Sequence, residues 1–233
     1  SYFSGRPVFD EIWPRFLVTI RMSLLILVIS VCVGVPVGIY SAVRQYSLWD
    51  TVPTMMAFFL AAVPSFVIGM VLMYFFALKI NIFPSFGLSG LKSYILPVSA
   101  VAISEAAAYL RFTKSSMLEA IRQDYVRTAR GKGVPERTVI WKHAMRNALL
   151  PVITCVGMRF GVLLAGMVTT ERLFSIPGIG SLIVDSISKK DEPVIIAASI
   201  LIASAFTMLM LLVDIAYAYV DPRIRAKYSR LER

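Results

Sequence analysis

Charged residues are scarce in this sequence. Asp, Glu, Lys and Arg make up only 16% of the 233 residues, whereas a soluble domain carries about 25%. Hydrophobic residues account for 58% and the mean hydropathy is +0.73, against the ~45–50% apolar content of a soluble domain. These values exclude a disordered chain, a collagen-like repeat and an ordinary soluble enzyme, and they indicate a membrane protein.

Cysteine and histidine are scarce as well. Cys32 and Cys155 each lie within an apolar run, so neither a disulfide framework nor a zinc site is expected. The single histidine, His143, has no nearby Ser or Cys partner with an orienting acid, and we expect a structural or docking role for it. The sequence also lacks G-x-x-x-x-G-K-S/T, H-E-x-x-H and G-x-S-x-G, so this chain is not expected to bind ATP or to be an enzyme.

Long apolar runs dominate instead. A helix that spans a membrane needs about 20 mostly apolar residues. The runs predict an all-α, polytopic bundle of transmembrane helices with five spans, which are Phe16–Val43, Pro53–Leu78, Leu96–Phe112, Ala148–Thr170 and Val194–Val220.

Two of these runs carry a pair of closely spaced glycines. Gly34 and Gly38 lie in the first run, and Gly157 and Gly161 lie in the fourth. Small residues at this spacing let two membrane helices pack closely. We expect this packing to occur within the subunit rather than at a subunit interface.

The distribution of Lys and Arg predicts the orientation of the spans. Segment 111–147 holds nine of the 24, and the loops on its side of the membrane hold 15 against 7 on the other side. The positive-inside rule places 111–147 and the tail, 221–233, in the cytoplasm, and segment 1–15 outside it. Five spans with an external start lead us to expect a sixth, N-terminal span before Ser1. Because the positive charge lies in inner loops, no nucleic-acid partner is expected.

The basic stretch Thr113–Thr154 has the pattern of two short helices. Ser115 or Ser116 can cap the first helix, the Gly-x-Gly at 131–133 breaks it, and Pro135 opens the second. We expect two Arg-rich helices that lie parallel to the membrane and are joined by a glycine turn.

Two motifs in this stretch carry a family resemblance. DYVRTARGKG at 124–133 and HAMRNALLP at 143–151 resemble the cytoplasmic coupling loop of ABC importer permeases of the peptide/opine/nickel class, in the B-type subunit. The Pro-Ser-Phe at 64–66 and the E-x-x-F-x-x-P-G-x-G run at 171–180 are similar to the same class. The resemblance extends over nearly the whole chain and implies the type I ABC importer permease fold.

The resemblance implies that the loop 113–148 seats on a partner ATPase. Arg127 and Arg130 would meet acidic groups of that partner, and Gly133 would permit the sharp turn. The alternative is a basic loop held at the membrane surface by anionic lipid headgroups. The residues assigned to ATPase coupling are Glu119, Asp124, Tyr125, Arg127, Ala129, Arg130, Lys132, Gly133, His143, Arg146 and Asn147.

Two charged residues lie inside predicted spans. At a rise of ~1.5 Å per residue, Glu105 and Arg159 both lie about 14–17 Å deep, so we expect them to meet. An ionisable group at this depth costs at least about 2.5–3.5 kcal/mol and is a functional candidate by default. Two interpretations stay open, an interhelical ion pair and a polar lining that contacts a charged substrate. The substrate-pathway residues are Pro64, Ser65, Glu105 and Arg159.

The loop 171–193 lies on the predicted outer side. It has a turn at Pro177–Gly178, and the apolar residues from Ile179 to Ile187 predict a short helix at the outer surface. The resemblance implies that this loop contacts an extracytoplasmic binding protein or closes an outer gate. The outer-gate residues are Phe174, Pro177, Gly178 and Gly180.

The resemblance implies a permease subunit that forms half of a pathway for small peptides or for nickel and other metal chelates. It implies a multi-pass protein of a bacterial-type inner (plasma) membrane. The expected partners are a second homologous permease, two ATP-binding subunits that hold ATP and Mg, an extracytoplasmic substrate-binding protein and the lipid membrane. This chain itself is expected to hold no cofactor or metal. The alternatives are an ion-coupled secondary transporter, for which internal repeats are lacking, and an intramembrane enzyme.

Overall fold

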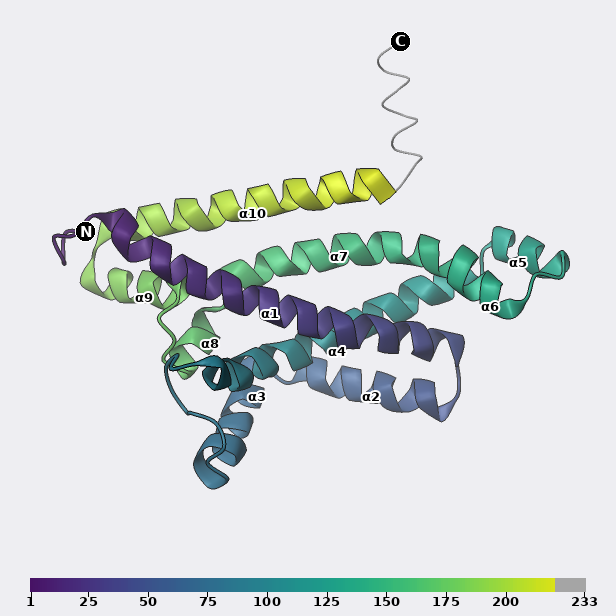
Figure 1. The fold of residues 1–233 in the computed structure, drawn as a ribbon, viewed down its shortest axis with the longest axis horizontal. Coiled ribbons are helices and arrows are strands. Elements are labelled where there is room, and N and C mark those ends of the chain that lie inside the picture. The colour runs from purple at the N-terminus through teal and green to yellow at the C-terminus, as the bar shows by residue number, and fades with distance from the viewer. Residues whose placement is uncertain (221–233) are drawn as a thin grey trace, which may run out of the picture. The chain divides into compact units, whose positions relative to one another are not determined.

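The computed structural model describes residues 1–220, with their side chains except those at 165, 166 and 216–220. The predicted cytoplasmic tail, 221–233, lies outside the described residues. Throughout residues 1–220 the regular structure is helical (Figure 1). The all-helical fold class predicted from the apolar runs is therefore confirmed.

The helices follow one another in chain order and are joined by short turns, except at 80–90, where a longer loop separates η1 from η2 (Figure 1). The longest helices are α1, α4, α7 and α10, and the shorter ones lie between them. The elements are α1 (Val8–Val43), α2 (Leu48–Ala62), α3 (Ser65–Leu72), the π-helical η1 (Met73–Lys79), the 3₁₀ turn η2 (Leu91–Tyr94), α4 (Ile95–Ile121), α5 (Asp124–Gly131), α6 (Glu136–Thr138), the π-helical η3 (Val139–Ala144), α7 (Met145–Gly166), α8 (Val168–Leu173), α9 (Ile179–Lys189) and α10 (Glu192–Val220).

Within residues 1–220, four stretches are long and apolar enough to cross a membrane, by length and composition. They are Val8–Val43, Leu91–Ile121, Glu136–Leu164 and Glu192–Ile215. A fifth candidate passes only as a pair of helices, α2 followed by α3 and η1. Each predicted span therefore corresponds to one of these stretches.

The second span differs from its prediction because it is not one helix. α2 ends at Ala62, and Pro64 precedes α3 with φ −58° and ψ 139°, which is not helical. A proline disfavours the helical conformation of the residue before it, here Val63, and supplies no N–H to continue the ladder. The apolar character of the run is continuous through this point, so hydropathy alone does not register the break.

The predicted cap at Ser115 or Ser116 is wrong. α4 runs without interruption to Ile121, so the first part of the predicted loop is helix. The Ser116 hydroxyl donates to the Ala148 carbonyl at 2.7 Å instead of capping a helix. The next helix, α5, begins at Asp124, after Gln123 in an extended conformation. Tertiary packing of the last turns of α4 has overridden the local capping pattern.

The chain divides into two compact units. The first comprises Ser1–Ile29, Ala62–Glu105 and Arg159–Met208, and the second comprises Ser30–Ala61, Ala106–Met158 and the chain from Leu209 onward. α1, α4, α7 and α10 each contribute residues to both units.

In the first unit, the apolar core joins the start of α1 to α9 and α10. Ile12 and Phe16 pack with the buried residues Ile179 and Leu182 of α9. Val194 and Ala198 of α10 complete this cluster. The predicted outer-surface helix therefore forms as α9, and its buried face holds it against the two neighbouring helices.

In the second unit, α1 and α4 approach closely at glycines. A Cβ atom on Gly38 would lie 2.6 Å from the Leu110 carbonyl oxygen, and one on Gly34 would collide with the Ala106 carbonyl. The other two glycines, in α7, face side chains of α10 in the same subunit. Gly157 faces Val213 within the second unit, and Gly161 faces Phe206 within the first unit. The prediction that these glycines pack within the subunit is confirmed.

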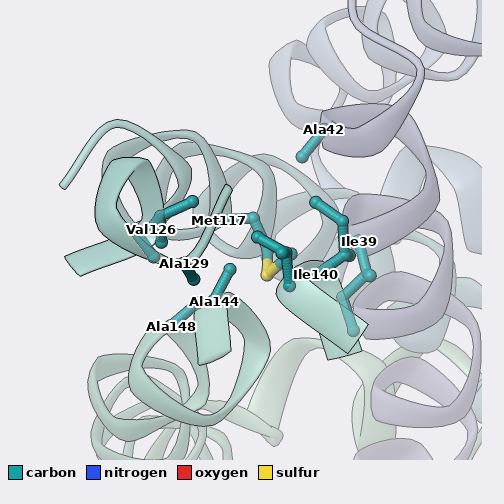
Figure 2. Packing of buried hydrophobic residues seen from close by; sticks show 10 residues of the cluster. Ile39, Ala42, Met117, Val126, Ala129, Ile140, Ala144 and Ala148 are labelled. Carbon is teal, nitrogen blue, oxygen red and sulfur yellow. The ribbon is translucent and has the colours of Figure 1, made fainter. Parts of the chain in front are cut away.

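The main apolar core of the second unit gathers the end of α1, the end of α4 and the segment that follows (Figure 2). Most of its members are small, and Met117, Val126, Val139 and Ala144 are fully buried. We call this cluster the coupling core. Its buried members are Ile39, Ala42, Met117, Ala120, Val126, Ala129, Val139, Ile140, Ala144 and Ala148.

Candidate functional site

α5 presents a polar face over the coupling core. Val126 and Ala129 point into the core, where Figure 2 shows them beside Ala144. Asp124, Arg127 and Arg130 lie on the exposed face, and the Arg127 side chain is 78% exposed. Apolar contacts thus fix α5 from behind, while its polar, mainly basic face stays exposed.

A left-handed residue ends α5. Gly133 has φ +74°, and its N–H donates to the Arg130 carbonyl at 2.9 Å. The next N–H, of Val134, reaches the Ala129 carbonyl at 3.2 Å. Residues with a Cβ rarely adopt this conformation, so the turn needs glycine at 133. Gly131 lies inside α5 with open space around it and has no such requirement.

An ion pair within the chain closes the same turn. Arg130 Nη2 and Nε donate to the two Glu136 carboxylate oxygens at 2.6 and 3.1 Å. Its hydrogen bonds to the Glu136 carboxylate raise the pKa of the Arg130 guanidinium above its ordinary value. Arg130 is therefore engaged inside the chain, whereas we had expected it, like Arg127, to face a partner. The sequence spacing of six residues gave no helical signal for this pair.

Three of the predicted coupling residues border one hollow of about 500 Å³ in the second unit. Glu119, Tyr125 and Asn147 line it together with Gln123 and Ser116. The Asn147 side-chain amide donates to the His143 carbonyl at 3.0 Å, and the His143 side chain is half-buried. Lys132 and Arg146, the other basic members of the set, are exposed.

Glu105 and Arg159 meet, as their depth predicts. Arg159 Nε donates to Glu105 Oε2 at 2.7 Å, and Nη2 donates to Oε1 at 3.0 Å. This is the two-pronged geometry in which arginine binds a carboxylate most strongly. The Glu105 side chain is 14% exposed and that of Arg159 is 40% exposed. Both residues belong to the first unit.

The other two predicted pathway residues begin α3. Pro64 is exposed and Ser65 is half-buried, at the break in the second span. Of the predicted pathway residues, Glu105 and Arg159 form an ion pair, and Pro64 and Ser65 lie at the start of α3.

A buried carboxylate organises the predicted outer gate. Glu171 is fully buried and accepts hydrogen bonds from the Thr19 hydroxyl at 2.6 Å and the Ser181 N–H at 2.8 Å. The Thr19 oxygen also accepts the Ile179 N–H at 3.0 Å. Glu171 therefore ties the turn before α9 to α1. Our sequence reasoning missed this role, although Glu171 is the first residue of the quoted E-x-x-F-x-x-P-G-x-G run.

The two glycines of that run lie against the same turn. A Cβ atom on Gly178 would collide with the Glu171 carboxylate, and one on Gly180 would lie 2.7 Å from Val168 Cγ2 and 3.0 Å from Glu171 Oε2. Phe174 is buried, and its carbonyl accepts the Gly87 N–H at 2.8 Å. Pro177 is the exposed member of the predicted gate set.

Comparison with known proteins decides the family. Residues 34–226 match the family described as "Binding-protein-dependent transport system inner membrane component". The chain belongs to this family. It is a multi-pass permease subunit of an ABC importer in the bacterial inner membrane, as the coupling-loop motif predicts, and the family is one of transport permeases rather than enzymes.

Curated relatives and solved structures agree. The chain is 39% identical over 227 residues to "Glutathione transport system permease protein GsiC" of Salmonella choleraesuis (strain SC-B67), covering 97% of this chain and 74% of the relative. The protein of the same name from Escherichia coli (strain K12) gives the same values. An inward-facing structure of the MetNI methionine ABC transporter is similar with TM-score 0.73 at 14% identity, over 93% of this chain and 99% of that one. A structure titled as an amino acid ABC transporter with histidines has TM-score 0.65 at 14% identity, over 93% of both chains. These two likenesses confirm the type I permease fold.

Proposed function

We propose that this subunit works with a second homologous permease, two ATP-binding subunits and an extracytoplasmic substrate-binding protein. ATP and Mg are bound by the ATP-binding subunits, and this chain holds neither a cofactor nor a metal. The family assignment supports this set of partners, because its members transport in dependence on a binding protein.

The exposed face of α5 docks on the ATPase from the cytoplasmic side. Support comes from the coupling core, which fixes α5 and η3 to α4 and α1 through close-packed small residues. A close-packed interior transmits a displacement instead of absorbing it. Closure of the ATPase pair therefore moves α4 and α1 as one body, which is the rigid-body class of transition.

The Glu105–Arg159 pair lines the translocation pathway. The single observation that carries this assignment is the 40% exposure of the Arg159 side chain within a span. A guanidinium that faces lipid at this depth is costly. The exposed side of Arg159 is therefore covered by water, substrate or another subunit rather than by acyl chains.

Small peptides are the substrate class that we propose. The curated relatives at 39% identity are named for glutathione transport, and glutathione is a small peptide with several charged groups. A salt-bridged acid and base in the pathway suit a substrate that carries both an ammonium and carboxylates. The outer gate, held by Glu171, opens toward the binding protein on the other side of the membrane.

Uptake of labelled glutathione and dipeptides into proteoliposomes tests this function. The complete complex, with its binding protein, should import peptide only with ATP present. A complex whose ATPase subunits bind but cannot hydrolyse ATP is the matched control and should not import. Uptake driven by an ion gradient in vesicles that hold the permeases alone would instead support the ion-coupled transporter.

A further inference from the structure

A buried polar network joins α1, α2 and α4 in the second unit. The Asp50 carboxylate, 5% exposed, forms an ion pair with the Lys114 ammonium. It also accepts hydrogen bonds from the Tyr46 N–H at 3.0 Å and from the hydroxyls of Ser41 and Thr54. Lys114 Nζ donates in turn to Thr54 Oγ1 at 3.0 Å. Three helices and the turn between two of them therefore meet at one carboxylate.

Apolar packing already holds these helices together. α1 meets α4 at Gly38, and Ala57 of α2 packs against Ala107 and Leu110 of α4. A buried ion pair can often be replaced by apolar residues with little loss of stability. Because the hydrophobic effect is non-directional, these apolar contacts set the position of one helix along another less strictly than a charged hydrogen-bonded pair does. What the Asp50 network adds is a fixed position of α2 along α4.

The network adjoins the coupling core. Lys114 precedes Met117 by less than one turn of the unbroken helix α4. Ser41 lies between Ile39 and Ala42 in α1, and these two residues belong to the coupling core, as Met117 does. No residue of that core comes from α2. A displacement of the coupling core therefore reaches α2 through the polar contacts of Asp50 and Lys114.

We propose that the Asp50–Lys114 network is a clamp that makes α2 move with the coupling core. Asp50 and Lys114 are positioning residues, and neither contacts the ATPase or the substrate. α2 leads directly into Pro64, so the clamp connects the ATPase-driven movement to the broken second span. The clamp rests on the proposed function, because it presumes that ATP moves the coupling core.

The test separates a clamp from a merely structural pair. In the complete complex, D50L/K114M removes both charges and retains apolar packing, so no charge is stranded. Lys114→Arg keeps a cation that can reach the carboxylate. Lys79→Met is the control for loss of a lysine, since Lys79 is exposed and lies over the Phe75 ring instead of a carboxylate. Assembly, ATP hydrolysis and peptide uptake are measured on the same proteoliposomes.

We expect D50L/K114M to assemble and hydrolyse ATP while peptide imported per ATP falls at least about threefold, as for a coupling residue. Lys114→Arg and Lys79→Met should keep the wild-type ratio. An unchanged ratio in D50L/K114M would overturn the clamp, and so would failure of that variant to assemble, which would make the pair a folding element. A wild-type complex that does not import counts against the proposed function itself.

Discussion

Replacing Glu105 and Arg159 singly and together separates a structural ion pair from a pathway lining. The variants are Glu105→Gln, Arg159→Met and the double change. Each single variant strands one charge inside the first unit, whereas the double variant strands none. Arg159→Met and the double change remove both hydrogen bonds, of 2.7 and 3.0 Å, whereas the amide oxygen of Glu105→Gln still accepts one of them.

The exposed fractions of the two side chains set how much each variant should lower the free energy of unfolding. Arg159→Met leaves Glu105, 14% exposed, and should cost about 3 kcal/mol, the lower end for breaking a buried pair. Glu105→Gln leaves Arg159, 40% exposed, and should cost about 1.5 kcal/mol, the lower end for a hydrogen bond to a charged group. The double variant should lie within about 1 kcal/mol of the wild type. The two single losses sum to about 4.5 kcal/mol, so the two substitutions are coupled by about 3.5 kcal/mol or more.

Thermal unfolding of the purified complex and uptake per assembled complex are the two measurements. The double variant should recover the wild-type amount and thermal stability, yet import charged peptides about tenfold more slowly or worse, because each peptide loses a charged partner. The exposed Arg172–Asp185 pair, with Nη2–Oδ1 at 2.7 Å, is the control for stability, and its double cycle should show under about 1 kcal/mol. A Glu105–Arg159 double variant that imports every peptide at the wild-type rate would refute the pathway role.

Three further substitutions test single features. Gly133→Val should leave membrane insertion intact but weaken ATPase binding or uncouple hydrolysis from uptake, because φ +74° excludes a β-branched residue; Gly131→Ala is the control and should behave as wild type in both assays. Gly178→Ala should sharply lower the amount of folded protein, measured by size-exclusion chromatography, because its methyl group meets the buried carboxylate; normal folding would show that the outer turn can shift. Glu136→Gln should cost less than about 1 kcal/mol in thermal unfolding, because the ion pair with Arg130 is 41% and 60% exposed, and a larger loss would mean that this turn is buried against a partner.

The long apolar runs predicted much of the fold, and the depth of two charged residues within their spans predicted part of the site. The runs located the four long apolar helices and the bent pair of α2 with α3 and η1, and the depth argument brought Glu105 and Arg159 together. The glycine turn at Gly133 was predicted because only a residue without a Cβ adopts its conformation readily. These features depend on the local sequence or on distance along a helix, and both can be worked out from a single sequence.

The features that were missed depend on residues far apart in the chain. Thr19 and Glu171 are separated by 152 positions, and Lys114 and Thr54 by 60. No periodicity within one sequence pairs such residues. The failed cap at Ser116 has the same origin, because its hydroxyl found a carbonyl 32 positions away. The break at Pro64 is different, because a proline disfavours the helical conformation of the residue before it and is visible in the sequence itself.

Cross-linking tests most directly that α5 is the surface on which an ATPase acts. In a complex with both native cysteines replaced, Arg127→Cys puts a thiol on the exposed face of α5, and Ile187→Cys puts one on α9, where Ile187 is 57% exposed. A short cross-linker with a maleimide at one end and an amine-reactive ester at the other should join a surface lysine of the ATPase subunit to the thiol at position 127, with a yield that changes when ATP is bound, and not to the thiol at position 187. A cross-link to the ATPase at 187, or none at 127, would contradict the account.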